Sequence, residues 1–170
     1  MIKTFVAGDV FSSTSPEAFS MHEKSNWGEK NGKRIDYSGV EVLYLVEQGK
    51  MEVFFREKEI DFDSLMKRLI AKDKKIETKY AVFRDLRKKG YIVKTALKFG
   101  AEFRVYDKGI KPGEDHAKWV VFTVKETERT SWHEFAAKNR VAHSTRKNLL
   151  ICIVDEEGGV SYYEVEWRKV

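Results

Sequence analysis

Three polar residues of different acidity, Tyr106, His116 and Lys147, have the side-chain types that RNA cleavage without a metal ion requires. RNA breaks when its own 2′-hydroxyl attacks phosphorus, which needs a base at the 2′-oxygen, an acid at the departing 5′-oxygen and a cation beside the phosphorane. Histidine suits the acid, because its pKa lies near neutrality and the neighbouring Asp115 would hold it protonated. Lysine suits the cation. An ordinary phenol is only about one part in a thousand ionised at pH 7, so Tyr106 either loses its proton beside Lys147 or only orients the 2′-hydroxyl.

The order of the predicted elements brings these three residues to one edge of a sheet. "KWVVFTV" and "NLLICIV" have strand composition, and the capping box of Ser131 and Glu134 predicts a helix between them that starts at Trp132. Two strands joined by a helical crossover lie parallel in one sheet. "AEFRVY" is joined to "KWVVFTV" by a loop without a helix, so we expect those two strands to be antiparallel neighbours. The end of the first, the loop residue His116 and the stretch "STRKN" should therefore meet.

The remaining segments predict an α/β (α+β) chain of two domains. In a small helix-rich N-terminal domain with a short sheet, residues 1–75, "YSGVEVLYLVEQGK" and "DFDSLMKRLIAKD" predict helices. Ser38 caps the first helix and Asp61 or Asp63 caps the second, while "MEVFF" is a short strand. The charged stretch "KDKK" is the candidate boundary. In the C-terminal catalytic domain, residues 76–170, a helix in "ETKYAVFRDLRKKGY" precedes a nuclease-like mixed sheet that starts with "YIVKTALKF" and ends with the hairpin strand "GVSYYEVEW".

Composition favours a polyanionic partner and a reducing compartment. The net charge is +5 and the pI is about 9.1, although 27 acidic residues are mixed among the 32 basic ones, so nucleic acid is favoured. The single cysteine, Cys152, lies in the apolar run "LLICIV", which excludes a cysteine-rich zinc module. No apolar run reaches a membrane-spanning length, and the N-terminus lacks a basic leader. We therefore expect a cytoplasmic protein, and the 35% of charged residues with one glutamine resembles heat-adapted proteins.

Other chemistries find little support in the sequence. In "GEDH" adjacent side chains point in different directions and no His or Cys partner follows at ligand spacing, so we predict no metal ligand and no cofactor. A Pro-Asp followed by an acid-x-Lys element, typical of a magnesium nuclease, is absent, as are glycine-rich phosphate loops and a G-x-S-x-G elbow. His22, His133 and His143 are interpreted as structural.

Three ordered blocks resemble a known family. The run "YAVFRDLRKKGYIVKTALKFGAEFRVYDKG", followed by "GEDHAKWVVF" and "VAHSTRKNLLICIVD", resembles the catalytic domain of the archaeal tRNA-splicing endonucleases. "YSGVEVLYLVEQGK" resembles the Leu-rich helix of that family's N-terminal domain. The resemblance implies a triad of Tyr106, His116 and Lys147 that acts without metal on precursor tRNA folded into a bulge-helix-bulge. It implies 2′,3′-cyclic phosphate and 5′-hydroxyl ends. It also implies that Arg140 and Arg168 sandwich a flipped bulge base.

The resemblance extends to assembly. A chain with one complete triad is similar to the homotetrameric class, a dimer of dimers, in which an acidic loop of one dimer enters a basic groove of the other. The matching loop here is "DEEGG", with Asp155, Glu156 and Glu157, and "SYYEVEW" would form the dimer edge. Two alternatives stay open: a magnesium-dependent nuclease on a related α/β sheet, and a non-catalytic subunit that contributes RNA contacts and assembly.

Overall fold

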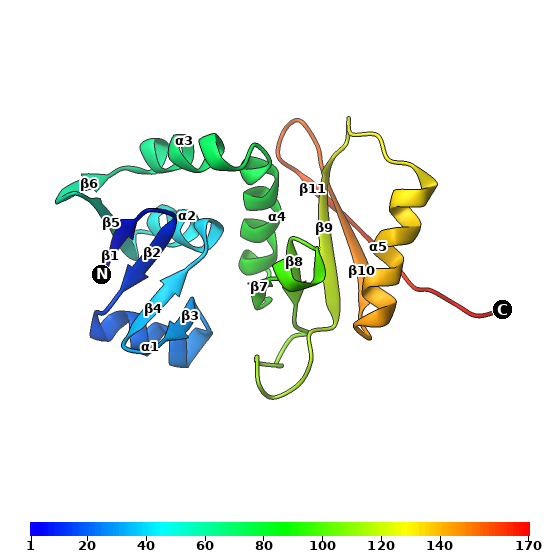
Figure 1. Cartoon of the computed structure of the whole chain (residues 1–170), viewed down its shortest axis with the longest axis horizontal. Helices are drawn as coiled ribbons and strands as arrows, with labels where there is room; N and C mark the ends of the chain where they lie inside the picture. Colours follow the sequence, from blue (N-terminus) through cyan, green and yellow to red (C-terminus); the bar gives the residue numbers. More distant parts are fainter. The chain divides into compact units, whose positions relative to one another are not determined.

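All 170 residues are described by the computed structural model, which divides into two units, Met1–Tyr80 and Ala81–Val170 (Figure 1). Each unit is built around a sheet of its own. Helix α4 (Ile76–Lys88) begins in the first unit and ends in the second. The domain ranges 1–75 and 76–170 therefore stay a prediction.

The N-terminal unit contains a six-stranded sheet, of which the sequence analysis predicted only one strand, β5. The sheet has the order β3-β4-β2-β1-β5-β6, and β1 and β5 are its one parallel pair. β3 escaped prediction because it is short and exposes all three of its residues. β1, in contrast, alternates buried and exposed positions over its six residues, a signal in "IKTFVA" that the sequence analysis missed. The elements of this unit are β1 (Ile2–Ala7), β2 (Val10–Ser13), α1 (Pro16–Ser25), β3 (Glu29–Asn31), β4 (Arg34–Tyr37), α2 (Gly39–Glu47), β5 (Met51–Phe55), β6 (Lys58–Ile60) and α3 (Phe62–Lys72).

Helix caps fix the two predicted helices of this unit. Ser38 and Glu41 form a capping box at the start of α2, whose residues Val42, Leu43 and Leu45 are fully buried. Of the two candidates for the cap of α3, Asp61 is the one that acts, because its carboxylate accepts a hydrogen bond of 2.7 Å from the backbone N–H of Ser64. Both helices begin where the sequence predicts.

The C-terminal unit contains a five-stranded mixed sheet with the order β11-β10-β9-β8-β7. β9 and β10 are parallel, with α5 between them along the chain, and β8 is antiparallel to β9. Both predicted pairings are confirmed, and so is the α/β class. The elements of this unit, besides the end of α4, are β7 (Val93–Thr95), η1 (Leu97–Phe99), β8 (Phe103–Val105), β9 (Trp119–Lys125), α5 (Trp132–Ser144), β10 (Asn148–Val154) and β11 (Val160–Val165).

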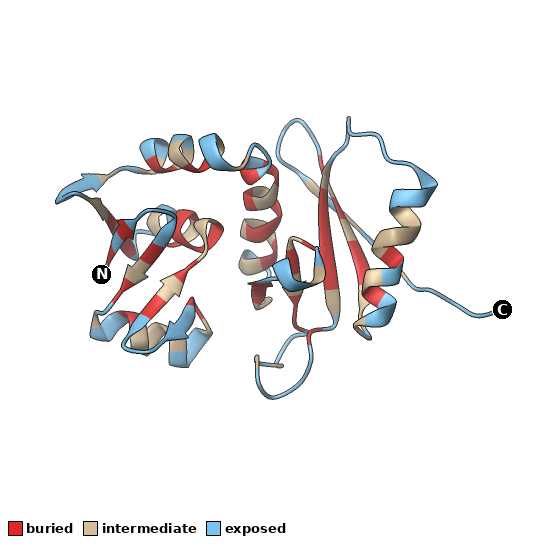
Figure 2. Ribbon diagram, viewed as in Figure 1, coloured by how far each residue is buried: buried red, intermediate tan, exposed pale blue.

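The core of this unit lies on both faces of its sheet (Figure 2). On one face Val120, Phe122 and Leu149 pack with Ala142 of α5, while on the other Phe83 of α4 and Phe103 form a tilted aromatic pair. Because both faces are covered, consecutive residues of β9 are buried, as is usual for central parallel strands. The sheet edge at the start of β9 and β10 is thereby held rigidly.

The predicted strand "YIVKTALKF" is shorter in the structure. Only Val93–Thr95 pairs with β8, and Leu97–Phe99 form a 3₁₀ turn that ends at Gly100, whose φ is +70°. The turn brings the backbone N–H of Ala101 back to the carbonyl of Ala96. Phe99 is thereby placed beside the sheet edge, where it lines the site described next.

Candidate active site

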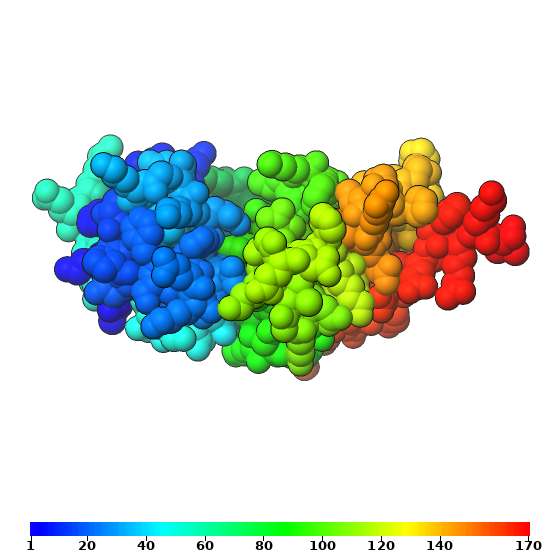
Figure 3. Space-filling view, turned by 90° about the horizontal axis from the view of Figure 1, so that it is seen from below, coloured from blue at the N-terminus to red at the C-terminus, as the bar shows by residue number.

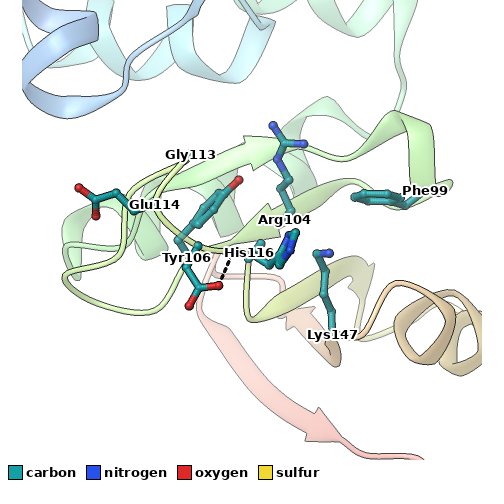
Figure 4. Close-up of a pocket in the computed structure, with 9 residues that line it drawn as sticks. Phe99, Arg104, Tyr106, Gly113, Glu114, His116 and Lys147 are labelled. Carbon is teal, nitrogen blue, oxygen red and sulfur yellow. Dashed lines mark hydrogen bonds between the residues drawn. The ribbon is translucent and has the colours of Figure 1, made fainter.

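A pocket of about 360 Å³ in the C-terminal unit is lined by Tyr106, His116 and Lys147 together (Figure 4). We call it the edge pocket. Its complete lining is Phe99, Arg104, Tyr106, Gly113, Glu114, Asp115, His116, Ala117 and Lys147. The structure thus brings the three residues of the predicted triad to one place, whereas their catalytic roles stay predictions.

Backbone hydrogen bonds at one sheet edge explain why these residues meet. The N–H of Lys118 donates at 2.9 Å to the carbonyl of Val105, the last residue of β8. The N–H of Asn148, the first residue of β10, donates at 2.9 Å to the carbonyl of Lys118, which directly precedes β9. The end of β8 and the starts of β9 and β10 are therefore side by side, and each contributes one triad residue or its neighbour.

Tyr106 is held firmly, whereas His116 lies on an exposed loop. The Tyr106 side chain is only 6% exposed, and its hydroxyl extends from the end of β8 along the pocket (Figure 4). The loop between β8 and β9 carries His116 and turns at Gly113, whose φ of +91° suits glycine. Figure 3 shows this loop in yellow-green on the surface of the C-terminal unit. A buried phenol and an exposed imidazole thus line the same pocket.

The two acids beside His116 do not contact its ring. Asp115 accepts a hydrogen bond of 2.7 Å from the backbone N–H of His116, drawn as a dashed line in Figure 4. Glu114 accepts one of 3.2 Å from the backbone N–H of Lys111. The expectation that Asp115 acts on the imidazole is therefore not met by a hydrogen bond: both carboxylates hold the loop backbone. Both ring nitrogens of His116 are left available to a ligand.

Lys147 is half-buried, and its amine is directed by its neighbours. Its Nζ donates a hydrogen bond of 3.0 Å to the carbonyl of Thr145 and lies 5.0 Å from the centroid of the Phe99 ring. Burial, together with the positive charge of Arg104, lowers the pKa of Lys147 below its ordinary value. The amine is thus a partly buried cation, which interacts more strongly with an anion than a fully solvated one does.

Comparison with known proteins identifies the family of this chain. The model of the tRNA intron endonuclease catalytic C-terminal domain matches residues 76–162, and that of the tRNA intron endonuclease N-terminal domain matches residues 1–66. The chain belongs to the tRNA intron endonuclease family. The family predicted from the three sequence blocks is confirmed, and with it an endonuclease that cleaves tRNA introns.

The similarity to individual members of the tRNA intron endonuclease family spans nearly the whole chain. A tRNA-splicing endonuclease of Pyrococcus horikoshii is 41% identical over 169 residues, which cover 99% of this chain and 97% of the relative. One of Thermococcus kodakarensis is 40% identical over 170 residues, 99% of each chain. One of Methanothermobacter thermautotrophicus is 37% identical over 147 residues, 86% of this chain and 85% of the relative. These relatives are archaeal proteins, as the resemblance found in the sequence predicts.

The two predicted base-binding arginines of this family member lie outside the edge pocket. Arg140 is exposed on α5, and Arg168 is exposed after β11, where it forms an ion pair of 3.4 Å with Glu166. Trp167, which precedes Arg168, packs on His143 of α5, with ring centroids 4.4 Å apart. His143 was interpreted as structural, and this contact ties the chain after β11 to α5.

The acidic turn between β10 and β11 is fully exposed, but its three acids differ. Asp155 accepts hydrogen bonds from the backbone N–H groups of Glu157 and Gly159, at 2.9 Å and 2.7 Å, so its carboxylate shapes the turn. Glu156 and Glu157 point their charges into solvent. Any partner of this turn therefore meets two glutamates on a frame built by Asp155.

Arg104 is the functional candidate that the sequence analysis missed. It lines the edge pocket and contributes to the shifted pKa of Lys147. A signal was available, because Arg104 and Tyr106 are two residues apart on one strand, and such residues share a face. Metal-ligand geometry is absent: no group of three or more His, Cys, Asp or Glu side chains is arranged to hold an ion. None of the helices combines the length and apolar content needed to cross a membrane.

Proposed function

We propose that this protein is a metal-independent endoribonuclease that excises introns from precursor tRNA at bulge-helix-bulge motifs and leaves 2′,3′-cyclic phosphate and 5′-hydroxyl ends. The observation that carries the proposal is the edge pocket, in which a phenol, an imidazole and an amine line one cavity. These are the groups that transesterification by the 2′-hydroxyl needs. Membership of the tRNA intron endonuclease family supplies the substrate class.

Each residue has one role in the proposed reaction. As the 2′-oxygen bonds to phosphorus, its proton passes to a solvent water molecule beside Tyr106, whose hydroxyl orients the nucleophile. The bond from phosphorus to the 5′-oxygen breaks, and His116 gives that oxygen its proton. Lys147 neutralises the charge that accumulates on the phosphorane. The exposed loop lets His116 reach the leaving group, while the buried Tyr106 and half-buried Lys147 stay fixed.

Cleavage in excess chelator tests this chemistry against a magnesium-dependent nuclease. We expect the rate with a bulge-helix-bulge RNA to stay within about twofold when EDTA replaces Mg²⁺, because no step in the proposed mechanism uses a metal ion. Spermidine should replace Mg²⁺ as the counterion that keeps the RNA folded. The ends are identified by mass for the cyclic phosphate and by direct kinase labelling for the 5′-hydroxyl. Loss of cleavage in chelator, with the RNA still folded, would favour the magnesium nuclease.

Substrate contacts and assembly complete the proposal. Arg140 and Arg168 stack on a flipped bulge base, since guanidinium planes are a common platform for single-stranded bases. The chain assembles as a dimer of dimers through β11, the edge strand of its sheet. Each chain has an N-terminal domain, residues 1–75, and a catalytic domain, residues 76–170. It acts in the cytoplasm, consistent with its lone buried thiol, Cys152.

Neutralising the acidic turn tests the assembly. The triple variant Asp155→Asn, Glu156→Gln, Glu157→Gln should sediment as a dimer and cleave precursor tRNA poorly, because removing three charges weakens attraction to a basic groove. The double variant Glu156→Gln, Glu157→Gln keeps the Asp155 frame of the turn. It should give the same result if charge, and not the shape of the turn, drives assembly.

A matched control removes three exposed acids elsewhere. Glu23→Gln, Glu59→Gln, Glu126→Gln changes the net charge equally at exposed positions on other elements and should remain a tetramer. Sedimentation velocity at moderate salt reads out all the variants. An intact tetramer in the triple variant of the turn would refute its role in assembly.

A further inference from the structure

Arg104 occupies the centre of the short strand β8 and faces the edge pocket. Its neighbours Phe103 and Val105 are buried in the core, at 2% and 0% exposure. Because side chains alternate along a strand, Arg104 shares the opposite face with Tyr106. Tyr106 directly follows β8, and Figure 4 shows the Tyr106 hydroxyl and the Arg104 guanidinium extending to the same side. Arg104 is thus placed by the same strand that places Tyr106.

The guanidinium of Arg104 lacks the partner that a structural arginine has. Its Nε is buried and has no hydrogen-bond partner, and such groups carry a free-energy penalty that native proteins rarely leave uncompensated. The two carboxylates of the pocket do not supply the missing acceptor. Glu114 and Asp115 accept instead from the backbone N–H groups of Lys111 and His116.

A second cation, Lys147, lines the same pocket as Arg104. The two positive charges repel each other, and the charge of Arg104 contributes to lowering the pKa of Lys147. An anion bound in the edge pocket would relieve this repulsion and supply the missing acceptor.

We propose that Arg104 is a further catalytic residue, whose guanidinium donates hydrogen bonds to a non-bridging oxygen of the phosphate that is cleaved. This inference rests on the proposed function. The planar fork of a guanidinium matches phosphate oxygens, whereas the ammonium of Lys147 acts as a point charge. Two cations of different geometry thus share the charge of the phosphorane, which is greatest in the transition state. The cavity of about 360 Å³ has room for a phosphodiester between them.

Substitution of Arg104 gives the first test. Arg104→Met keeps an unbranched stem of similar shape and should slow single-turnover cleavage of a bulge-helix-bulge RNA about 10- to 100-fold, as expected for loss of one charged hydrogen bond. Arg104→Lys should recover part of this loss. The control Arg129→Met removes an exposed charge between β9 and α5, outside the pocket, and should cleave at the normal rate. Cleavage by Arg104→Met within twofold of the unsubstituted enzyme would overturn the proposal.

A sulfur-substituted RNA separates direct contact from a structural effect. In the unsubstituted enzyme, sulfur at one of the two non-bridging positions of the cleaved phosphate should slow cleavage, because sulfur is a weaker hydrogen-bond acceptor. In Arg104→Met or Arg104→Lys the penalty at that position should shrink, since the contact is already lost or altered. If Arg104 only supports the fold, its substitution would slow cleavage of ordinary RNA and of sulfur-substituted RNA by the same factor. The ratio of the two rates would then be unchanged, which would refute the contact.

The test distinguishes failure of this inference from failure of the proposed function. If the unsubstituted protein does not cleave the RNA in chelator, the proposed function fails. If it cleaves, and the Arg104 variants show the normal rate or an unchanged sulfur penalty, only the role of Arg104 fails. Should Arg104→Met unfold, as shown by its thermal transition, the sulfur penalty in Arg104→Lys decides.

Discussion

Replacing His116 with alanine is expected to lower the single-turnover rate of precursor tRNA cleavage at least about 100-fold, within the range for loss of a general acid. Binding of the RNA should be retained, because the imidazole is exposed and its charge is not needed for phosphate contacts. Stability should be retained as well. The contact that holds the loop is made by the backbone N–H of His116 to Asp115, and alanine keeps it. The measurements are cleavage rate, RNA affinity and thermal unfolding of the same variant.

A modified leaving group identifies the role of His116 more directly. A substrate with sulfur in place of the 5′-oxygen departs as a thiolate, which needs no proton, because thiols are far more acidic than alcohols. His116→Ala should cleave this substrate at nearly the rate of the unsubstituted enzyme. The matched control is His133→Ala, at an exposed position in the first turn of α5, and it should behave normally with both substrates. Normal cleavage of ordinary RNA by His116→Ala would eliminate the proposed acid.

The part of the site that could be predicted follows from strand order. The capping box of Ser131 and Glu134 fixes the start of α5, and a helix between two apolar strands leaves little choice but a parallel pair. Once β9 and β10 are parallel and β8 is antiparallel to β9, the chain around Tyr106, His116 and Lys147 must share an edge. No knowledge of side-chain positions is needed for that conclusion.

The parts that escaped prediction depend on tertiary contacts. β3 has no apolar pattern and pairs with β4 only because the rest of the N-terminal sheet is in place. The Asp115 carboxylate could accept a hydrogen bond from either the imidazole or the backbone N–H of His116. It accepts from the backbone N–H, because aspartate side chains readily form such local hydrogen bonds with the neighbouring backbone. The spacing of two residues between Arg104 and Tyr106 indicates a shared strand face, but it does not show that the Nε of Arg104 is buried without a hydrogen-bond partner.

Loss of the Lys147 charge is expected to have an effect as large as loss of His116. Lys147→Met should slow cleavage by about 100- to 1,000-fold, the range for removing one preorganised donor from a developing oxyanion. Lys125→Met, at the exposed far end of β9, is the matched control and should cleave normally. A Lys147→Met rate within threefold of the unsubstituted enzyme would show that the amine does not act on the phosphorane.

The pH dependence adds a signature that a purely structural lysine lacks. The acting species is the charged amine, which is present below the pKa of Lys147 and is lost as the pH rises through it. Burial and the charge of Arg104 lower that pKa, so the rate should begin to fall at a lower pH than an ordinary lysine would allow. In Lys147→Arg the guanidinium stays charged throughout, so this decline should move to higher pH even if the maximal rate is reduced. Single-turnover rates, corrected for alkaline hydrolysis of the RNA alone, measure both profiles. Coincident alkaline declines in the two proteins would mean that another group titrates, and that the lowered pKa of Lys147 has no part in catalysis.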